Sequence, residues 1–102
     1  METVVKMMRS KKGVVKGQFT VANDRGLHTR PSTEIVKCAT GFKSDVKLAY
    51  QKLEVSAKSL LGILMLAAAK GAKISVIAEG DDAEEAVASL IALAKQNFNI
   101  KY

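Results

Sequence analysis

The chain has 102 residues and a formal net charge of +6, and 48% of its residues are hydrophobic. This length accommodates one domain, and the hydrophobic content suffices for a globular core. The charge does not indicate a nucleic-acid binder, because residues 1–17 hold five lysines and arginines against one glutamate, a net +4. The remaining 85 residues therefore carry only +2, and the five aromatic residues of the chain do not mark a basic binding face.

The single cysteine, Cys38, excludes an internal disulfide and fits a reducing cytoplasm. The apolar residues near the N-terminus are interrupted by charges every few positions, unlike the core of a signal peptide. The longest apolar run, residues 60–69, contains Gly62 and is far shorter than the roughly 18 residues that a membrane span needs. We therefore expect a cytoplasmic protein that does not insert into a membrane.

Residues 1–17 have no clear hydrophobic period and are predicted to be an extension without fixed structure, with Val14 and Val15 as candidates to lengthen the strand that follows. Residues 18–22 alternate between polar and apolar, as a half-buried strand does, and residues 23–26 are typical of a turn. The domain is thus expected to span residues 18–98, followed by a short tail, residues 99–102.

The next stretch holds the only histidine, His28, and the only proline, Pro31. Proline suits the first turn of a helix, so His28 is expected at or just before a helix N-terminus. Unpaired backbone N–H groups and the positive end of the helix dipole favour phosphate there, and an imidazole in that place can accept a phosphoryl group. Arg30 adds a positive charge with a donor fork suited to phosphate.

Other roles for His28 are open on position alone. A lone histidine near a helix start is more often a surface residue or an incidental cap. A zinc site is disfavoured because one histidine and one cysteine do not supply the usual ligands. A nucleophilic pair with Cys38 is also disfavoured, since ten residues of mainly helical rise separate the two by roughly 15 Å.

The helix that contains Pro31 is predicted over residues 29–40, with Gly41 as its stop. Residues 46–50 and 53–55 alternate and predict a hairpin. Its turn, Gln51-Lys52, has no glycine to supply a positive φ, so a less tight turn is expected.

Ser59 is predicted to open a second helix, which continues to Lys70-Gly71 and is apolar almost all round. Ile63 and Leu66 are expected in the core. A surface helix needs only one apolar stripe, so Leu60, Leu61 and Leu64 are surplus and indicate a partner-docking patch. The alternative is a helix buried on both sides.

Residues 74–78 predict a further strand, and a last helix with an apolar period to Phe98 is expected to start at Gly80-Asp81-Asp82. The carboxylates at its start fit a cap and a first helical turn better than a metal site. The order of elements predicts an α+β domain, an open-faced sandwich of a four-stranded antiparallel sheet with three helices on one face.

Two motifs carry a resemblance to a known family. Residues 26–31, Gly-Leu-His-Thr-Arg-Pro, resemble the active-site motif of HPr, the histidine-containing phosphocarrier of the bacterial phosphoenolpyruvate:sugar phosphotransferase system. Residues 58–64, Lys-Ser-Leu-Leu-Gly-Ile-Leu, resemble the regulatory-serine helix of that family, at the family's spacing. The resemblance runs from about Gln18 to about Phe98 and implies the same open-faced sandwich.

The resemblance also implies a function. Enzyme I would transfer a phosphoryl group from phosphoenolpyruvate to Nδ1 of His28, and a sugar-permease IIA domain would receive it. Thr29 and Arg30 would hold the phosphoryl group, and Ser59 would be the target of an HPr serine kinase. The expected docking surface consists of Leu27, Leu60, Leu61 and Leu64.

Such a protein is a monomeric phosphoryl carrier rather than a free-standing enzyme, and it needs no metal and no organic cofactor of its own. One alternative is a regulatory interaction module, controlled by phosphorylation of Ser59, that takes no direct part in sugar transport. A weaker alternative is a small nucleic-acid binder that uses the basic residues 1–17.

Overall fold

The computed structural model describes residues 8–9 and 13–99. From β2 onward, the strands and helices follow in the predicted order: β1 (Met8–Arg9), β2 (Val14–Thr20), α1 (Thr29–Thr40), β3 (Asp45–Tyr50), β4 (Leu53–Ser56), α2 (Leu60–Met65), β5 (Lys73–Glu79), α3 (Ala83–Lys95) and a 3-10 turn, η1 (Asn97–Asn99). None of the helices in the described part of the chain has the length and apolarity required to cross a membrane.

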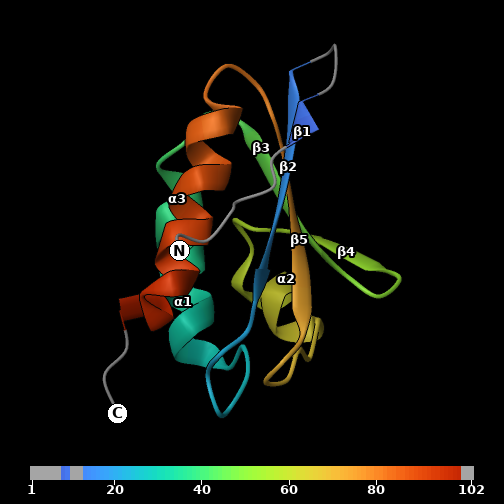
Figure 1. Ribbon diagram of the computed structural model, residues 1–102, viewed down its shortest axis with the longest axis vertical. Helices are drawn as coiled ribbons and strands as arrows, with labels where there is room; N and C mark the ends of the chain where they lie inside the picture. Colours follow the sequence, from blue (N-terminus) through green and yellow to red (C-terminus); the bar gives the residue numbers. More distant parts are fainter. Residues whose placement is uncertain (1–7, 10–12, 100–102) are drawn as a thin grey trace, which may run out of the picture.

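The strands form one antiparallel sheet in the order β1-β2-β5-β3-β4. The predicted four-stranded antiparallel sheet is therefore confirmed, and the two-residue strand β1 extends it beyond the edge of β2 (Figure 1). Strand β5 lies in the middle, since it pairs with β2 from Val14↔Glu79 to Thr20↔Lys73 and with β3 on its other side.

Strand β2 begins at Val14, before the expected domain start at Gln18, so Val14 and Val15 lengthen this strand as the sequence allowed. Val15, Gly17 and Phe19 are buried in alternation with exposed Lys16 and Gln18, so the period of the strand continues through residues assigned to the extension. A lysine and a glycine within the strand hid this period in the sequence. Residues 1–7, 10–12 and 100–102 lie outside the described residues, and with them most of the predicted extension and tail.

The three helices cover one face of the sheet, with α1 and α3 side by side and α2 near the lower end of the strands in Figure 1. Helix α1 has the predicted bounds, with Gly41 as its C-cap. The core between helices and sheet is largely aliphatic, and its largest fully buried side chains are Phe98, Ile35, Leu48, Ile63, Ile74, Leu90, Val15, Val21, Val46, Val76 and Val87.

Two further expectations need correction. The hairpin turn is tight, because Tyr50 pairs directly with Leu53 and Gln51 takes a positive φ of 57° without being glycine. A left-handed conformation costs a residue with a Cβ about 1–2 kcal/mol. Helix α3 ends at Lys95, and Phe98 lies in η1, where it is buried against Phe19 in an edge-to-face contact with 5.8 Å between ring centroids.

Helix α2 is shorter than predicted and ends at Met65. Ala67 then takes a positive φ of 52°, which turns the chain, and Ala68 is buried again. The apolar composition of residues 60–69 would suit a continuous helix. After this reversal, the Ala68 carbonyl accepts a hydrogen bond from the Leu27 N–H.

The α1–β3 loop and the β5–α3 loop lie at the upper end of the sheet in Figure 1, and a carboxylate joins the two loops. Asp82, the N-cap residue of α3, accepts hydrogen bonds from the Lys43 and Ser44 backbone N–H groups, each 2.9 Å long, and from the Ser44 hydroxyl. The Ser44 hydroxyl and then the Lys43 N–H hold the pKa of this carboxyl below its usual value. Gly80 is required beside Ser44, because a Cβ there would lie 2.6 Å from the Ser44 hydroxyl oxygen.

Candidate functional site

His28 is the N-cap residue of α1, as the position of Pro31 predicted. Its carbonyl accepts the Ser32 N–H at 3.1 Å, the first hydrogen bond of the helix. The N–H groups of Thr29 and Arg30 therefore have no acceptor within the helix, and Pro31 has no N–H. His28 thus stands beside two backbone donors at the positive end of a 12-residue helix.

Two consecutive turns shape the loop before His28. The Gly26 N–H donates to the Asn23 carbonyl at 3.0 Å, and the His28 N–H donates to the Gly26 carbonyl at 2.9 Å. Gly26 has a positive φ of 70°, and a Cβ on it would lie 2.3 Å from the Ala68 carbonyl oxygen. Only glycine satisfies both conditions, so Gly26 fixes the approach of the chain to His28.

The segment after α2 supports this loop from behind. The Leu27 N–H donates to the Ala68 carbonyl at 2.9 Å, and the buried Ser32 hydroxyl donates to the Leu27 carbonyl at 3.1 Å. The Leu27 side chain is only 4% exposed. The prediction that Leu27 belongs to the docking surface is therefore wrong, because this side chain packs in the core and holds the loop against it.

Asn23 is buried under the same loop and is only 1% exposed. Neither its side-chain oxygen nor its nitrogen has a hydrogen-bond partner among the residues that the structure describes. A buried polar group without a partner costs about 1–3 kcal/mol. The sequence indicated only a turn residue here, since asparagine is common in turns whether or not it is buried.

The turn before His28 is also tied to the other side of the site by an ion pair. The Lys70 ammonium lies 2.9 Å from a carboxylate oxygen of Asp24. This hydrogen bond, together with the positive charge of Lys70, holds the pKa of the Asp24 carboxyl below its usual value. Both groups are exposed, so the pair orients the two segments more than it stabilises the fold.

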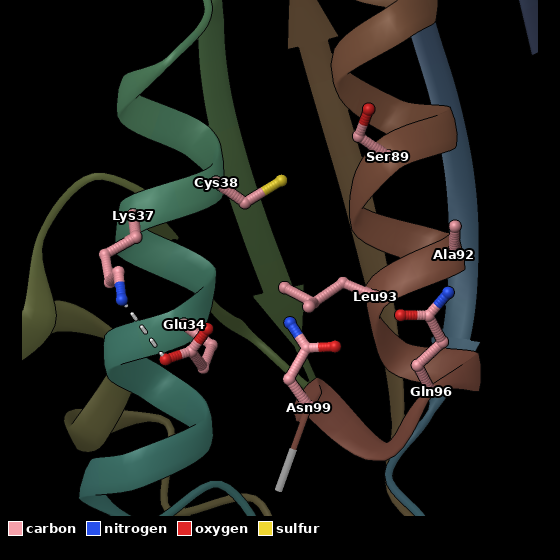
Figure 2. A pocket seen from close by; sticks show the side chains of 8 residues that line it. All are labelled: Glu34, Lys37, Cys38, Ser89, Ala92, Leu93, Gln96 and Asn99. Carbon is pink, nitrogen blue, oxygen red and sulfur yellow. Dashed lines mark ion pairs between the residues drawn. The ribbon is translucent and has the colours of Figure 1, made fainter.

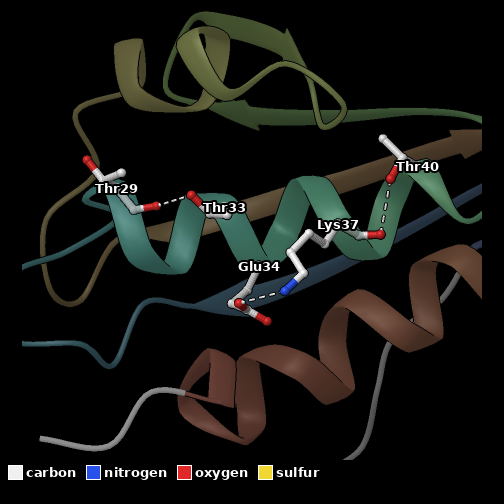
Figure 3. Close-up of polar contacts among 5 residues, drawn as sticks. All are labelled: Thr29, Thr33, Glu34, Lys37 and Thr40. Carbon is white, nitrogen blue, oxygen red and sulfur yellow. Dashed lines mark hydrogen bonds and ion pairs between the residues drawn. The ribbon is translucent and has the colours of Figure 1, made fainter.

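The polar side chains further along α1 bond to the helix itself (Figure 3). The Thr33 hydroxyl donates to the Thr29 carbonyl at 2.8 Å, and Lys37 pairs with Glu34 at 3.6 Å. The Thr33 hydroxyl proton is thus unavailable to a phosphoryl group. The donors left at the start of α1 come from Thr29 and Arg30, which are both exposed.

Helix α2 presents an apolar surface beside its capping serine. The Ser59 hydroxyl accepts the Gly62 N–H at 3.0 Å and so caps the helix. As predicted, Ile63 and Leu66 are buried. The exposed fractions of the remaining large side chains are 37% for Leu60, 68% for Leu61 and 63% for Met65, and Leu64 is half-buried. We call Leu60, Leu61, Leu64 and Met65 the α2 patch; Met65 was not singled out in the sequence because the predicted helix continued past it.

A groove of about 430 Å³ lies between α1 and α3, where Cys38 points into it and His28 does not line it (Figure 2). Burial raises the pKa of the Cys38 thiol, which keeps it protonated and unreactive. A smaller hollow of about 200 Å³ reaches the start of α1 and is lined by Thr29, Arg30, Thr33, Glu34 and Asn99. His28 lines neither of these two hollows.

Comparisons with known proteins agree with this geometry. Residues 15–96 match the family model described as the PTS HPr component phosphorylation site. The chain is 40% identical over 85 residues to the multiphosphoryl transfer protein of Haemophilus influenzae, a match that covers 80% of this chain and 17% of that protein. The chain thus spans about a sixth of the length of this relative.

Solved structures give the same result. The fold is similar to that of HPr-C-His from Thermoanaerobacter tengcongensis, with a TM-score of 0.80 and 33% identity over 85% of this chain and 98% of that chain. It is also similar to the phosphocarrier protein HPr from Bacillus anthracis, with a TM-score of 0.73 and 37% identity over 78% of this chain and 94% of that chain.

Proposed function

The chain belongs to the HPr family of the phosphotransferase system, and on that premise we propose that it carries a phosphoryl group on His28. It receives this group from Enzyme I and passes it to sugar-permease IIA domains. The observation that carries the proposal is the position of the His28 imidazole at the N-cap of α1, beside unused backbone N–H groups and the exposed Arg30.

The transfer forms a nitrogen–phosphorus bond on His28 as the bond between phosphorus and the donor breaks. A nitrogen lone pair of the His28 imidazole attacks the phosphorus as the bond to the donor breaks, and the donor leaves with the electron pair of that bond. The Thr29 and Arg30 N–H groups and the Arg30 guanidinium then stabilise the negative phosphoryl oxygens. All of these donors are at the surface, so their hold is moderate and onward transfer remains possible.

The test is incubation with phosphoenolpyruvate, Enzyme I and magnesium, followed by intact mass measurement. We expect one acid-labile phosphoryl group on the parent and none on His28→Ala. Arg30→Ala is expected to slow transfer about 5- to 150-fold, because a hydrogen bond to a charged group contributes roughly 1–3 kcal/mol. The matched control is Lys52→Ala, which removes an exposed charge from the β3–β4 turn. Labelling of His28→Ala equal to that of the parent would refute the proposal.

The α2 patch is the proposed contact surface for Enzyme I and the IIA domains. Leu61→Glu is the sharpest test, since Leu61 is the most exposed member and its replacement leaves the core intact. We expect a higher KM for the transfer from Enzyme I and an unchanged free energy of unfolding. Leu53→Glu, at a 41% exposed leucine of β4, is the control. If both variants transfer alike, the patch is not the contact surface.

Ser59 is the proposed regulatory residue. A phosphate on its hydroxyl would add nearly two negative charges beside the α2 patch, and Ser59→Asp is therefore expected to lower the rate of His28 phosphorylation. In the second candidate function, the chain is a regulatory module that acts through Ser59 alone. The labelling experiment separates the two, because that module would bind its partner without accepting a phosphoryl group on His28.

A further inference from the structure

Two arginines flank His28 along the chain. Arg25 lies in the turn before it, and Arg30 is the second residue of α1. Both are exposed, and neither guanidinium forms a hydrogen bond or ion pair with any residue in the described range 13–99. Arg30 lies within the Gly-Leu-His-Thr-Arg-Pro motif of residues 26–31, and Arg25 directly precedes this motif.

The nearest carboxylate in the sequence does not neutralise Arg25. Asp24 precedes it directly, but the Asp24 carboxylate pairs with Lys70 at 2.9 Å. The pairing lowers the pKa of Asp24, so this acid stays ionised and engaged with Lys70 at neutral pH. The positive charge of Arg25 therefore remains available to an incoming anion.

The backbone brings Arg25 within reach of the imidazole. Three residues of fully extended chain span about 10 Å at most. Here the chain is shortened, since one turn closes from Asn23 to Gly26 and a second from Gly26 to His28. Gly26 packs closely against the Ala68 carbonyl, and the Leu27 N–H donates a hydrogen bond to the same carbonyl. These two contacts fix the backbone distance between Arg25 and His28. A long arginine side chain bridges such a distance.

From these observations we infer that Arg25 is a second guanidinium ligand of the phosphoryl group on His28, acting from the loop side while Arg30 acts from the helix side. This inference rests on the proposed function. In the phosphorylated protein, N–H groups of Arg25 donate to phosphoryl oxygens without transferring a proton. The contact forms only once the phosphoryl group is present, so it stabilises the phosphorylated form over the free one.

An equilibrium measurement tests this role separately from docking. A contact with the phosphoryl group changes the equilibrium constant for transfer from phosphorylated Enzyme I, whereas a docking contact changes only the rates at which free species interconvert. We expect Arg25→Ala to lower this constant about fivefold, as loss of a charge-assisted hydrogen bond at an exposed site does. Arg25→Lys should recover part of the loss, and the charge control Lys52→Ala should match the parent. An unchanged constant in Arg25→Ala, whatever the rates, overturns the inference.

A second measurement needs no Enzyme I. Phosphoramidate phosphorylates histidine chemically, and NMR follows the Arg25 Nε–H signal of the full chain. We expect this signal to move on phosphorylation of the parent and to stay in place in phosphoramidate-treated His28→Ala. A signal that stays in place in phosphorylated parent overturns the inference. If Enzyme I fails to label His28 while the Arg25 signal responds to chemical phosphorylation, the proposed function fails and the contact stands.

Discussion

The two ends of the sheet are closed in different ways. At the upper end in Figure 1, the loops around Ser44 and Asp82 are joined by a carboxylate that accepts three hydrogen bonds. At the lower end, the loop before His28 is held by backbone contacts with residues 68–72 and by one exposed ion pair. Beneath this loop, the side chain of Asn23 is buried without a partner.

The two ends of the sheet differ in whether their polar groups are used by the fold or are left for binding. At the upper end, the Asp82 carboxylate and the donors of Lys43 and Ser44 that face it satisfy one another. At the lower end, the Thr29 and Arg30 N–H groups and the guanidinium groups of Arg25 and Arg30 have no partner among the described residues, and the α2 patch is partly exposed. Groups that a fold leaves unsatisfied are those available for chemistry. The lower end is thus expected to tolerate few backbone changes, yet to respond to phosphorylation.

Gly26→Ala should have the largest effect on this contrast. The substitution adds a Cβ 2.3 Å from the Ala68 carbonyl oxygen at a φ of 70°, so it must break the contact between the loop and residues 68–69. We expect a loss of about 3 kcal/mol in the free energy of unfolding, together with a large loss of His28 phosphorylation. Denaturant titration measures the free energy of unfolding, and the labelling assay measures the phosphorylation of His28.

The matched control for that variant is Gly71→Ala. Gly71 also has a positive φ, 91°, but a Cβ there meets no atom within 4 Å. This variant should lose about 1 kcal/mol and keep its phosphorylation. Equal losses in the two variants would mean that the close contact with Ala68 does not govern the site.

Asp82→Ala should weaken the upper end with a smaller effect. The variant removes the acceptor of three hydrogen bonds, and we expect a lower melting temperature with an unchanged rate of His28 phosphorylation. Because the pKa of Asp82 is depressed in the folded protein, its stabilisation is present above the usual carboxyl value of 3.8. It is lost as the pH falls through the folded value, so the parent and the variant should converge in acid.

The neighbouring carboxylate provides the control for the upper end. Asp81 is exposed and has no hydrogen bond or ion pair among the described residues, so Asp81→Ala should melt close to the parent at every pH. A difference between the parent and Asp82→Ala that persists unchanged in strong acid would argue against the carboxylate as its cause.

Ala67→Gly should have the smallest effect. Ala67 takes a φ of 52° where the chain reverses after α2, and glycine adopts this conformation without a Cβ penalty. We expect a gain of about 0.5 kcal/mol in the free energy of unfolding, because the relief exceeds the extra entropy of glycine in the unfolded chain. Ala69→Gly, at an exposed alanine with an ordinary φ, should instead lose a similar amount. A loss in both variants would show that Ala67 is not strained.

Local signals in the sequence predicted α1 and the place of His28. Pro31 marks the helix start, Gly41 marks its end, and a clear apolar period lies between them. These signals are near neighbours in the chain and need no knowledge of packing. The same holds for the order of the strands along the chain, because alternating polar and apolar residues mark each strand and turn residues mark its end.

The remaining features depend on distant contacts. Apolarity alone does not distinguish the core residue Leu27 from the exposed Leu61, because both are leucines within a short motif. Helix α2 ends just before the hydrogen bond between Leu27 and Ala68. The upper end of the sheet is closed by the hydrogen bond between Ser44 and Asp82, which are 38 residues apart. No local pattern contains either pair.

The most direct test of the account compares amide NMR spectra of the full chain before and after incubation with phosphoenolpyruvate and Enzyme I. We expect phosphorylation of His28 alone, with signal changes in residues 23–32 and 66–72, because the Leu27–Ala68 contact joins these segments. Signals of residues 43–45 and 79–83 should stay in place, and His28→Ala should show no change at all. A phosphoryl group on another residue, or equal changes at both ends of the sheet, would contradict the account.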